Sequence, residues 1–241
     1  QSVQGKDDLV RQLDNPEYVN NWGLFDDSLY DMTMDEIRRL DEADDGPWGV
    51  VTLSITGHAP NGFPAQSCIE RQGPFDGQDI LYSVECSAWL AQDLINGLEG
   101  LLENTLVAIM SDHLTMRVSV WDELTMLDRE NTFMLLGDHL TPRRIQRDAT
   151  MLDVFPTILE SLGFTLDDHR AGLGVSLLGD QETLVERHGL DTLNERLREE
   201  TALQHRLWEG LAPQPRDTDS TTPLEQVIET PADRTDEVDI M

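Results

Sequence analysis

The sequence predicts an α/β domain, because three apolar runs alternate with segments of helical spacing. Residues 48–55, 105–110 and 131–136 are near-continuous runs of β-branched and other apolar residues, a pattern typical of buried strands. Residues 79–102 and 151–162 instead repeat apolar side chains at helical spacing. Strands and helices in this order are typical of an α/β sandwich, so we expect a mixed, mostly parallel sheet packed against helices.

The loops between these elements follow from local sequence. The first 45 residues are polar and acidic, and a short helix is expected near residues 35–41. The run at 48–55 leads into residues 56–62, where glycine and proline impose a loop. Gly163 follows the helix predicted at 151–162 and suits a C-terminal cap.

The chain divides into three parts by composition. Residues 1–180 carry the alternating elements of the domain. Residues 181–212 are expected to form a charged helical extension, because glutamate and arginine alternate along them as on a solvated helix face. Residues 213–241 are rich in Pro, Thr, Asp and Glu and poor in apolar residues, which predicts a disordered acidic tail.

The charge of the chain excludes several partners. The formal net charge is −30, the pI is about 4.2, and Lys6 is the sole lysine. Binding to nucleic acid and electrostatic binding to an anionic membrane both need clustered Lys and Arg, so neither is expected. A surface this acidic repels itself unless salt screens it. A halophilic or salt-tolerant source is therefore expected, with an ordinary acidic protein as the alternative.

The N-terminal residue is not an initiator methionine. Gln1 is followed by no signal peptide, and the sequence has no run of eighteen apolar residues that could span a membrane. We therefore expect the chain to begin inside a longer polypeptide, with any membrane anchor upstream.

The two cysteines flank a loop rich in glycine and proline. Cys68 and Cys86 could form a disulfide, which would stabilise the fold by about 3 kcal/mol and would require an oxidising compartment. Two unpaired thiols are an equal alternative from spacing alone.

Three polar residues follow apolar runs and could carry chemistry. Asp112 and His113 come at the end of the run at 105–110, and sites in α/β sheets gather beyond the carboxyl ends of strands. A carboxylate beside an imidazole suits Mn²⁺, Zn²⁺ or Mg²⁺, although most such pairs are caps or loop hydrogen bonds. His58 also follows an apolar run, and a loop histidine of this kind is usually a solvent residue.

At these residues the chain resembles a known family. It is similar to the phosphoglycerol transferase I family of the alkaline phosphatase/sulfatase superfamily, and more distantly to lipoteichoic acid synthases. The matching segments come in family order: Asn21-Trp22-Gly23-Leu24-Phe25-Asp26-Asp27, Thr56-Gly57-His58-Ala59-Pro60-Asn61-Gly62-Phe63, Ser83-Val84-Glu85-Cys86-Ser87, Ser111-Asp112-His113-Leu114, Asp128-Arg129-Glu130-Asn131, Asp153-Val154-Phe155-Pro156-Thr157 and Gly172-Leu173-Gly174-Val175. The resemblance implies that residues 1–180 are the C-terminal part of a sulfatase-like catalytic domain.

The resemblance also implies a reaction. In that family a divalent metal, commonly Mn²⁺, is held by a Glu, a Thr nucleophile, an Asp and a His. It assigns metal binding to Asp112 and His113 and contact with the phosphoglycerol group to His58, while the Glu and Thr have no counterpart in this chain. Phosphoglycerol would pass from phosphatidylglycerol through the upstream Thr to a periplasmic glucan, at the periplasmic face of the inner membrane. A disulfide between Cys68 and Cys86 would fit that location.

Two other functions stay open from the sequence. A sulfatase or phosphodiesterase of the same superfamily would carry its nucleophile in a different part of the protein. A non-catalytic module is the second alternative, because these 241 residues alone contain no nucleophile and are expected to be inactive.

Overall fold

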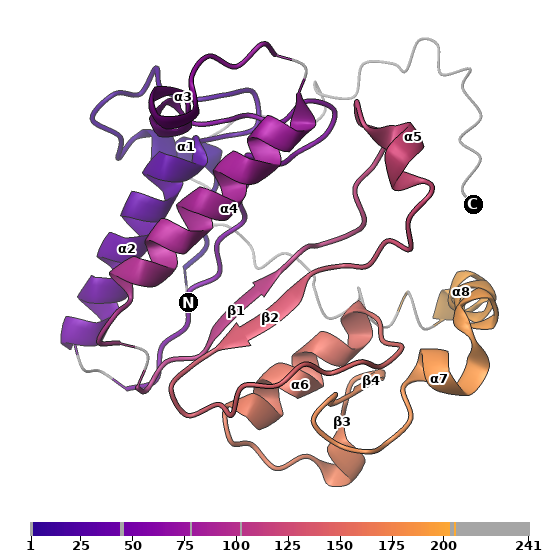
Figure 1. Ribbon diagram of the computed structural model, residues 1–241. Coiled ribbons are helices and arrows are strands. Elements are labelled where there is room, and N and C mark those ends of the chain that lie inside the picture. Colours follow the sequence, from indigo (N-terminus) through magenta and orange to yellow (C-terminus); the bar gives the residue numbers. More distant parts are fainter. Residues whose placement is uncertain (1, 44–45, 78, 102, 203–204, 206–241) are drawn as a thin grey trace. The chain divides into compact units, whose positions relative to one another are not determined.

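A computed structural model describes residues 2–43, 46–77, 79–101, 103–202 and 205 (Figure 1). The chain divides into two compact units, residues 1–187 and 188–241. The tail predicted at 213–241 lies outside the described residues. Among the described residues, no helix is long and apolar enough to cross a bilayer.

Two long helices, α2 (Asp26–Ala43) and α4 (Ile80–Gly97), pack side by side in the first unit (Figure 1). α2 is longer than the short helix expected near residues 35–41. Two aspartates in its first turn stabilise the helix, because their negative charge interacts favourably with the helix dipole. α4 begins where predicted, because the side chain of Asp79 accepts a hydrogen bond from the backbone N–H of Leu81 at 2.9 Å. The pair forms a helical layer.

The helical layer has an apolar core at each end. One core surrounds the disulfide between Cys68 and Cys86, which joins the short helix α3 (Gln66–Gln72) to α4. The structure thus contains the bond that spacing alone left open. The other core packs α2 and α4 against the strand β1 (Val107–Met110) and against residues 48–50. Strand-like segments therefore lie against helices, as in an α/β fold.

The strand β1 pairs with β2 (Phe133–Leu136), and the pairing is antiparallel. A second antiparallel pair joins β3 (Arg170–Ala171) and β4 (Gly174–Val175). Both strands predicted at 105–110 and 131–136 are thus present, but the described strands do not form the mixed, mostly parallel sheet that we expected. The apolar runs gave the positions of the strands, whereas strand direction depends on the pairing partner.

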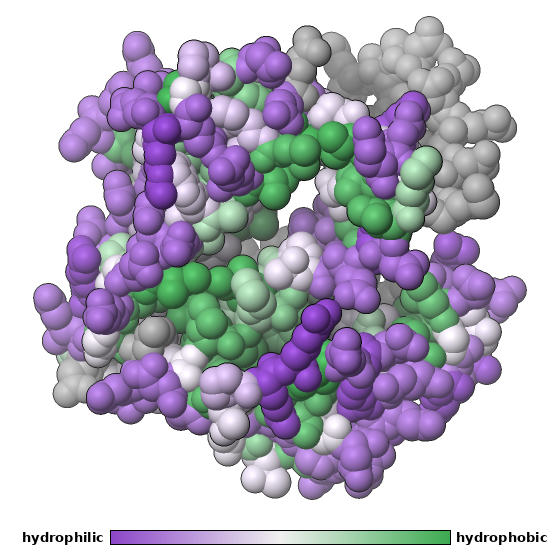
Figure 2. Space-filling view, in the orientation of Figure 1, coloured by the Kyte–Doolittle hydropathy of each residue, from purple (hydrophilic) through white to green (hydrophobic). Residues whose placement is uncertain are grey.

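The run at residues 48–55 is extended but is not part of a described sheet, so the prediction of a buried strand there is wrong for this structure. Its side chains alternate as in a strand: Trp48 and Val50 pack against the second core, whereas Val51 is 97% exposed and Leu53 is 77% exposed. One face of this segment is therefore partly buried, and its apolar opposite face is open. Met110 and Met134 of the β1–β2 pair are also about half exposed. Figure 2 shows that apolar surface is open to solvent on this face of the molecule.

The helix predicted at 151–162 begins as a 3₁₀ turn, η1 (Met151–Asp153), and continues as α6 (Val154–Ser161). The buried carboxylate of Asp153 accepts hydrogen bonds from the backbone N–H groups of Thr150 and Val175, both at 2.9 Å. The hydroxyl of Thr157 accepts one from the N–H of Leu177 at 2.9 Å. Asp153 therefore fastens β4 to η1, and Thr157 fastens the residues after β4 to α6.

The remaining helices are short. They are α1 (Lys6–Val10), α5 (Trp121–Leu124), η2 (Asp167–His169), α7 (Leu184–His188) and α8 (Leu190–Glu199). α7 and α8 lie within the extension predicted at 181–212, and residues 203–204 and 206–212 of that prediction lie outside the described part of the chain. The proposed domain boundaries at 180 and 212 stay predictions.

Candidate functional site

The end of β1 is fixed by a serine that continues the strand pairing. The backbone N–H of Ser111 donates to the carbonyl of Thr132 at 3.0 Å, and the N–H of Thr132 donates to the Ser111 hydroxyl at 3.0 Å. The guanidinium of Arg129 lies 4.8 Å from the ring centre of Trp121 and donates to the carbonyl of Thr115 at 3.0 Å. Residues 111–115 are thus fixed at both ends by contacts with the segment before β2, at Ser111 by Thr132 and at Thr115 by Arg129.

Asp112 and His113 are carried by this fixed turn, and their side chains lie together. The Nε2 atom of His113 is 3.5 Å from the Oδ2 atom of Asp112, and both side chains are more than half exposed. The Nδ1 atom of His113 is 2.7 Å from the carbonyl oxygen of Leu114, so an Nδ1–H that donates to that carbonyl leaves the Nε2 lone pair free. The Oδ1 atom of Asp112 accepts from the backbone N–H of His113 at 2.9 Å. These bonds turn Nε2 and Oδ2 toward the same space.

This pair of atoms fits two ligands of a divalent cation. A carboxylate oxygen and an imidazole nitrogen 3.5 Å apart are close enough to bind one ion with bonds of about 2 Å. A carbonyl that fixes the histidine tautomer from the other ring nitrogen is typical of metal-binding histidines. Among the described residues, no group of three or more His, Cys, Asp or Glu side chains could hold a metal ion. Asp112 and His113 would supply two ligands if a cation bound at this position.

The loop that carries His58 is anchored by a buried carboxylate. Asp26, the first residue of α2, is 0% exposed and accepts hydrogen bonds from the backbone N–H groups of Ile55 and Thr56, both at 2.8 Å. The backbone N–H of His58 donates to the carbonyl of Ile55 at 3.0 Å. Asp26 therefore fixes the backbone of Ile55 and Thr56, and the hydrogen bond from His58 to Ile55 ties the histidine to this fixed backbone.

The other side of this loop is held by α4. The hydroxyl of Ser83 donates to the carbonyl of Asn61 at 2.9 Å. The next residue, Gly62, has φ of +79°, and a Cβ there would lie 2.2 Å from the Cβ of Ser83. Only glycine permits both this backbone conformation and this close approach. The loop therefore lies close against the helical layer.

Two aromatic side chains, Trp22 and Phe63, lie next to the ring of His58. The ring of Trp22 lies 4.4 Å from it between centroids, at an interplanar angle of 39°, and the ring of Phe63 lies 6.4 Å away. The Nδ1 atom of His58 is 2.6 Å from the carbonyl oxygen of Ala59, so an Nδ1–H that donates there leaves Nε2 free to contact a ligand. The ring is thus held in position by tilted contacts with two aromatic rings and by one hydrogen bond.

Sequence reasoning identified Asp112, His113 and His58 but assigned no role to Trp22 or Asp26. The ring of Trp22 contacts the ring of His58, and Asp26 anchors the His58 loop. Trp22 and Asp26 lie 36 and 32 positions before His58 in the chain. Both residues lie in the segment 21–27, which resembles the known family, and that resemblance could have identified them as residues near the site.

The other histidines of the first unit have structural partners. The Nε2 atom of His139 is 3.2 Å from the carbonyl oxygen of Ser161, and the Nδ1 atom of His169 is 2.7 Å from a carboxylate oxygen of Glu160. Both contacts tie α6 to neighbouring loops. These contacts give both histidines a structural role, so no catalytic role is needed to account for them.

The first unit packs helices against strand-like segments and has an Asp-His pair at the end of β1. A family model described as Sulfatase matches residues 1–164, and the chain belongs to the sulfatase family. The chain is also 30% identical over 184 residues to proteins named phosphoglycerol transferase I from Citrobacter koseri and Escherichia fergusonii, and 29% identical to the one from Shigella flexneri.

These alignments include 74% of this chain and 24% of each relative, so the chain spans about a quarter of the length of the curated relatives it matches. No solved structure matches the chain. The assignment to the family thus rests on sequence.

Proposed function

We propose that this chain is the metal-binding part of a phosphoglycerol transferase, which moves phosphoglycerol from phosphatidylglycerol to a hydroxyl of a periplasmic glucan. The observation that carries the proposal is the arrangement of Asp112 and His113, with Nε2 and Oδ2 3.5 Å apart at the end of β1. Membership of the sulfatase family and similarity to proteins named phosphoglycerol transferase I support this chemistry.

Asp112 and His113 would hold the divalent cation, for which Mn²⁺ is our proposal. When bound, such a cation polarises a phosphoryl oxygen as a Lewis acid. The attacking hydroxyl would come from a threonine outside these 241 residues. Its oxygen would form the new bond to phosphorus, while the diacylglycerol oxygen leaves with the bonding electrons and takes up a proton. A glucan hydroxyl would then displace the threonine oxygen from phosphorus.

His58 would orient the phosphoglycerol group. Its neutral ring can accept a hydrogen bond at Nε2 from a glycerol hydroxyl, and its protonated ring can donate from Nε2 to a phosphoryl oxygen. Trp22 contacts one side of the ring and would limit its rotation. His58 thus contributes position as well as a proton donor or acceptor.

The disulfide between Cys68 and Cys86 supports a location outside the cytoplasm, because such bonds persist in oxidising compartments. We propose the periplasmic face of the inner membrane, where both proposed substrates would be accessible. Attachment to the membrane would come from a part of the protein outside these residues.

The experiment is turnover by the full-length protein that contains this chain. With Mn²⁺ and phosphatidylglycerol, we expect release of diacylglycerol, and we expect His113→Ala to reduce it by at least a hundredfold. His188→Ala is the matched control, because it removes a histidine from a different part of the chain. Unchanged turnover in His113→Ala would reject the ligand assignment.

Hydrolysis of a sulfate ester or another phosphodiester is the second candidate, because the matching family model is described as Sulfatase. The same assay separates the two reactions. A transferase needs the glucan acceptor to form a phosphoglycerol-substituted product, whereas a hydrolase releases product at the same rate without it.

A further inference from the structure

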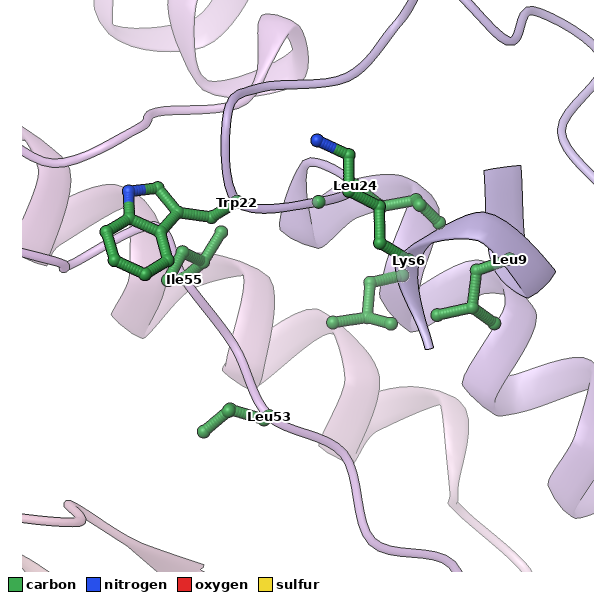
Figure 3. A pocket seen from close by; sticks show the side chains of 8 residues that line it. Lys6, Leu9, Trp22, Leu24, Leu53 and Ile55 are labelled. Carbon is green, nitrogen blue, oxygen red and sulfur yellow. The ribbon is translucent and has the colours of Figure 1, made fainter. Parts of the chain in front are cut away.

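An apolar cavity is lined by Trp22, one of the two aromatic residues that contact His58. It has a volume of about 180 Å³ and is otherwise lined mostly by aliphatic side chains from α1, from the loop before α2, from the first turn of α2 and from the segment before the His58 loop (Figure 3). These side chains are Leu9, Leu24, Leu29, Leu53 and Ile55. An open apolar cavity in a surface this acidic is a place where an apolar ligand, rather than an ionic one, gains free energy.

The cavity and the His58 subsite share a wall. Trp22 contacts the ring of His58 and also lines the cavity. Ile55 lines the cavity as well, and its carbonyl accepts a hydrogen bond from the backbone N–H of His58. A ligand whose polar group meets Nε2 of His58 can therefore continue past the indole into the cavity. The two compartments are adjacent and differ in polarity, as the two ends of a lipid do.

The single lysine of the chain lies at the rim of this cavity. The ammonium of Lys6 donates to the carbonyl oxygens of Asn20 and Asn21, at 3.0 and 3.1 Å, and it lines the cavity together with Trp22. An ammonium has three donors, so it can also donate to an ester carbonyl. A polar donor at the rim of an apolar cavity matches the point at which an acyl chain meets its glycerol ester.

We propose that this cavity binds the ester and first methylenes of an acyl chain of the phosphatidylglycerol donor, next to a headgroup at His58. The inference rests on the proposed function, because that function supplies the lipid. A volume of about 180 Å³ is smaller than the 300 Å³ or more of sites that enclose a drug-sized ligand. The cavity therefore takes the start of one chain, and not a whole lipid, a helix or a strand.

The test uses the 241-residue chain and soluble phosphatidylglycerols below their micelle concentrations. Titration calorimetry compares glycerophosphoglycerol, which has no acyl chain, with the dibutyryl and dihexanoyl lipids. We expect affinity to rise about fourfold for each methylene that enters, which corresponds to about 0.8 kcal/mol, and then to level off when the cavity is full. An affinity that does not depend on chain length would overturn the proposal.

Two variants in the same exposed segment serve as test and control. Leu53→Asn removes an apolar wall of the cavity, whereas Val51→Asn changes a side chain that does not line it. Both positions are mostly exposed, so neither variant is expected to unfold the protein. We expect Leu53→Asn to reduce affinity for the dihexanoyl lipid about tenfold without changing affinity for glycerophosphoglycerol, and Val51→Asn to change neither.

The outcomes separate this inference from the function on which it rests. If glycerophosphoglycerol binds and His58→Ala abolishes that binding, but chain length has no effect, the cavity proposal fails and the headgroup subsite stands. If chain length matters but glycerophosphoglycerol does not bind, the headgroup subsite fails. Equal losses in Leu53→Asn and Val51→Asn would show general adsorption to an apolar surface and would overturn the proposal.

Discussion

Replacement of Asp26 by alanine is expected to destabilise the first unit and release the His58 loop. The carboxylate is 0% exposed and accepts the backbone N–H groups of Ile55 and Thr56 at 2.8 Å. Asp26→Ala would leave both N–H groups without this acceptor in a site closed to water. Thr56 is itself fully buried, so its N–H cannot easily bind water instead.

The expected cost follows from these two bonds. A hydrogen bond to a charged group contributes about 1.5–3 kcal/mol, and the N–H groups left behind resist burial, so we expect a loss of about 3–5 kcal/mol. Domains have unfolding free energies of about 5–15 kcal/mol, so this loss is a large fraction of the total. Asp26→Asn keeps one acceptor oxygen and should lose about half as much.

Urea unfolding, followed by tryptophan fluorescence, measures the change. The midpoint should fall for Asp26→Ala while the slope with urea stays the same. Asp35→Ala is the matched control, because Asp35 is an exposed aspartate on the same helix, and it should change stability by less than about 0.5 kcal/mol. If both variants unfold at the same urea concentration, the carboxylate does not anchor this loop.

Three further predictions concern stability. Hydrogen bonds from Arg147 and Thr183 lower the pKa of Glu186 from 4.5 to about 2, so this carboxylate stabilises the fold above pH 4.5 and its contribution is lost as the pH falls towards 2. Because the ion pair is partly exposed, we expect the loss to be about 1–2 kcal/mol, seen as a smaller acid-induced drop in the melting temperature of Glu186→Gln. Replacing both Cys68 and Cys86 by alanine should cost about 3 kcal/mol in denaturant unfolding, and an equal midpoint would show that the disulfide does not stabilise the fold. Raising NaCl from 0.1 to 2 M should raise the melting temperature, because salt screens a net charge of −30, and a falling melting temperature would argue against the proposed salt tolerance.

Local sequence was sufficient to place several of the main elements of the first unit. Helical spacing of apolar residues predicted α4 and α6 within a few residues, and apolar runs predicted β1 and β2. The direction of strand pairing was not predictable, because apolar runs of this kind occur in parallel and antiparallel sheets alike. The segment at residues 48–55 shows the same limit: its alternating burial is that of a strand, but a sheet also needs a partner for its backbone.

The candidate site was predicted in part. Asp112 and His113 are neighbours in sequence, so their proximity needed only a turn after β1. The surroundings of His58 depend on Trp22 and Asp26, whose contacts with the loop span about thirty residues of sequence. Contacts of that kind arise from the packing of α2 against the rest of the unit, and a single sequence does not encode them in any local pattern.

The most direct test of the central claim is a titration of the 241-residue chain with Mn²⁺, followed by NMR of its six histidine rings. Paramagnetic broadening detects even weak binding, and two ligands alone bind weakly. The signals of His113 should broaden at the lowest Mn²⁺ concentration, ahead of those of His139 and His188, and this preference should vanish in Asp112→Ala. If His113 broadens no earlier than the other rings, or if Asp112→Ala leaves its broadening unchanged, the carboxylate and imidazole at the end of β1 do not form a metal site.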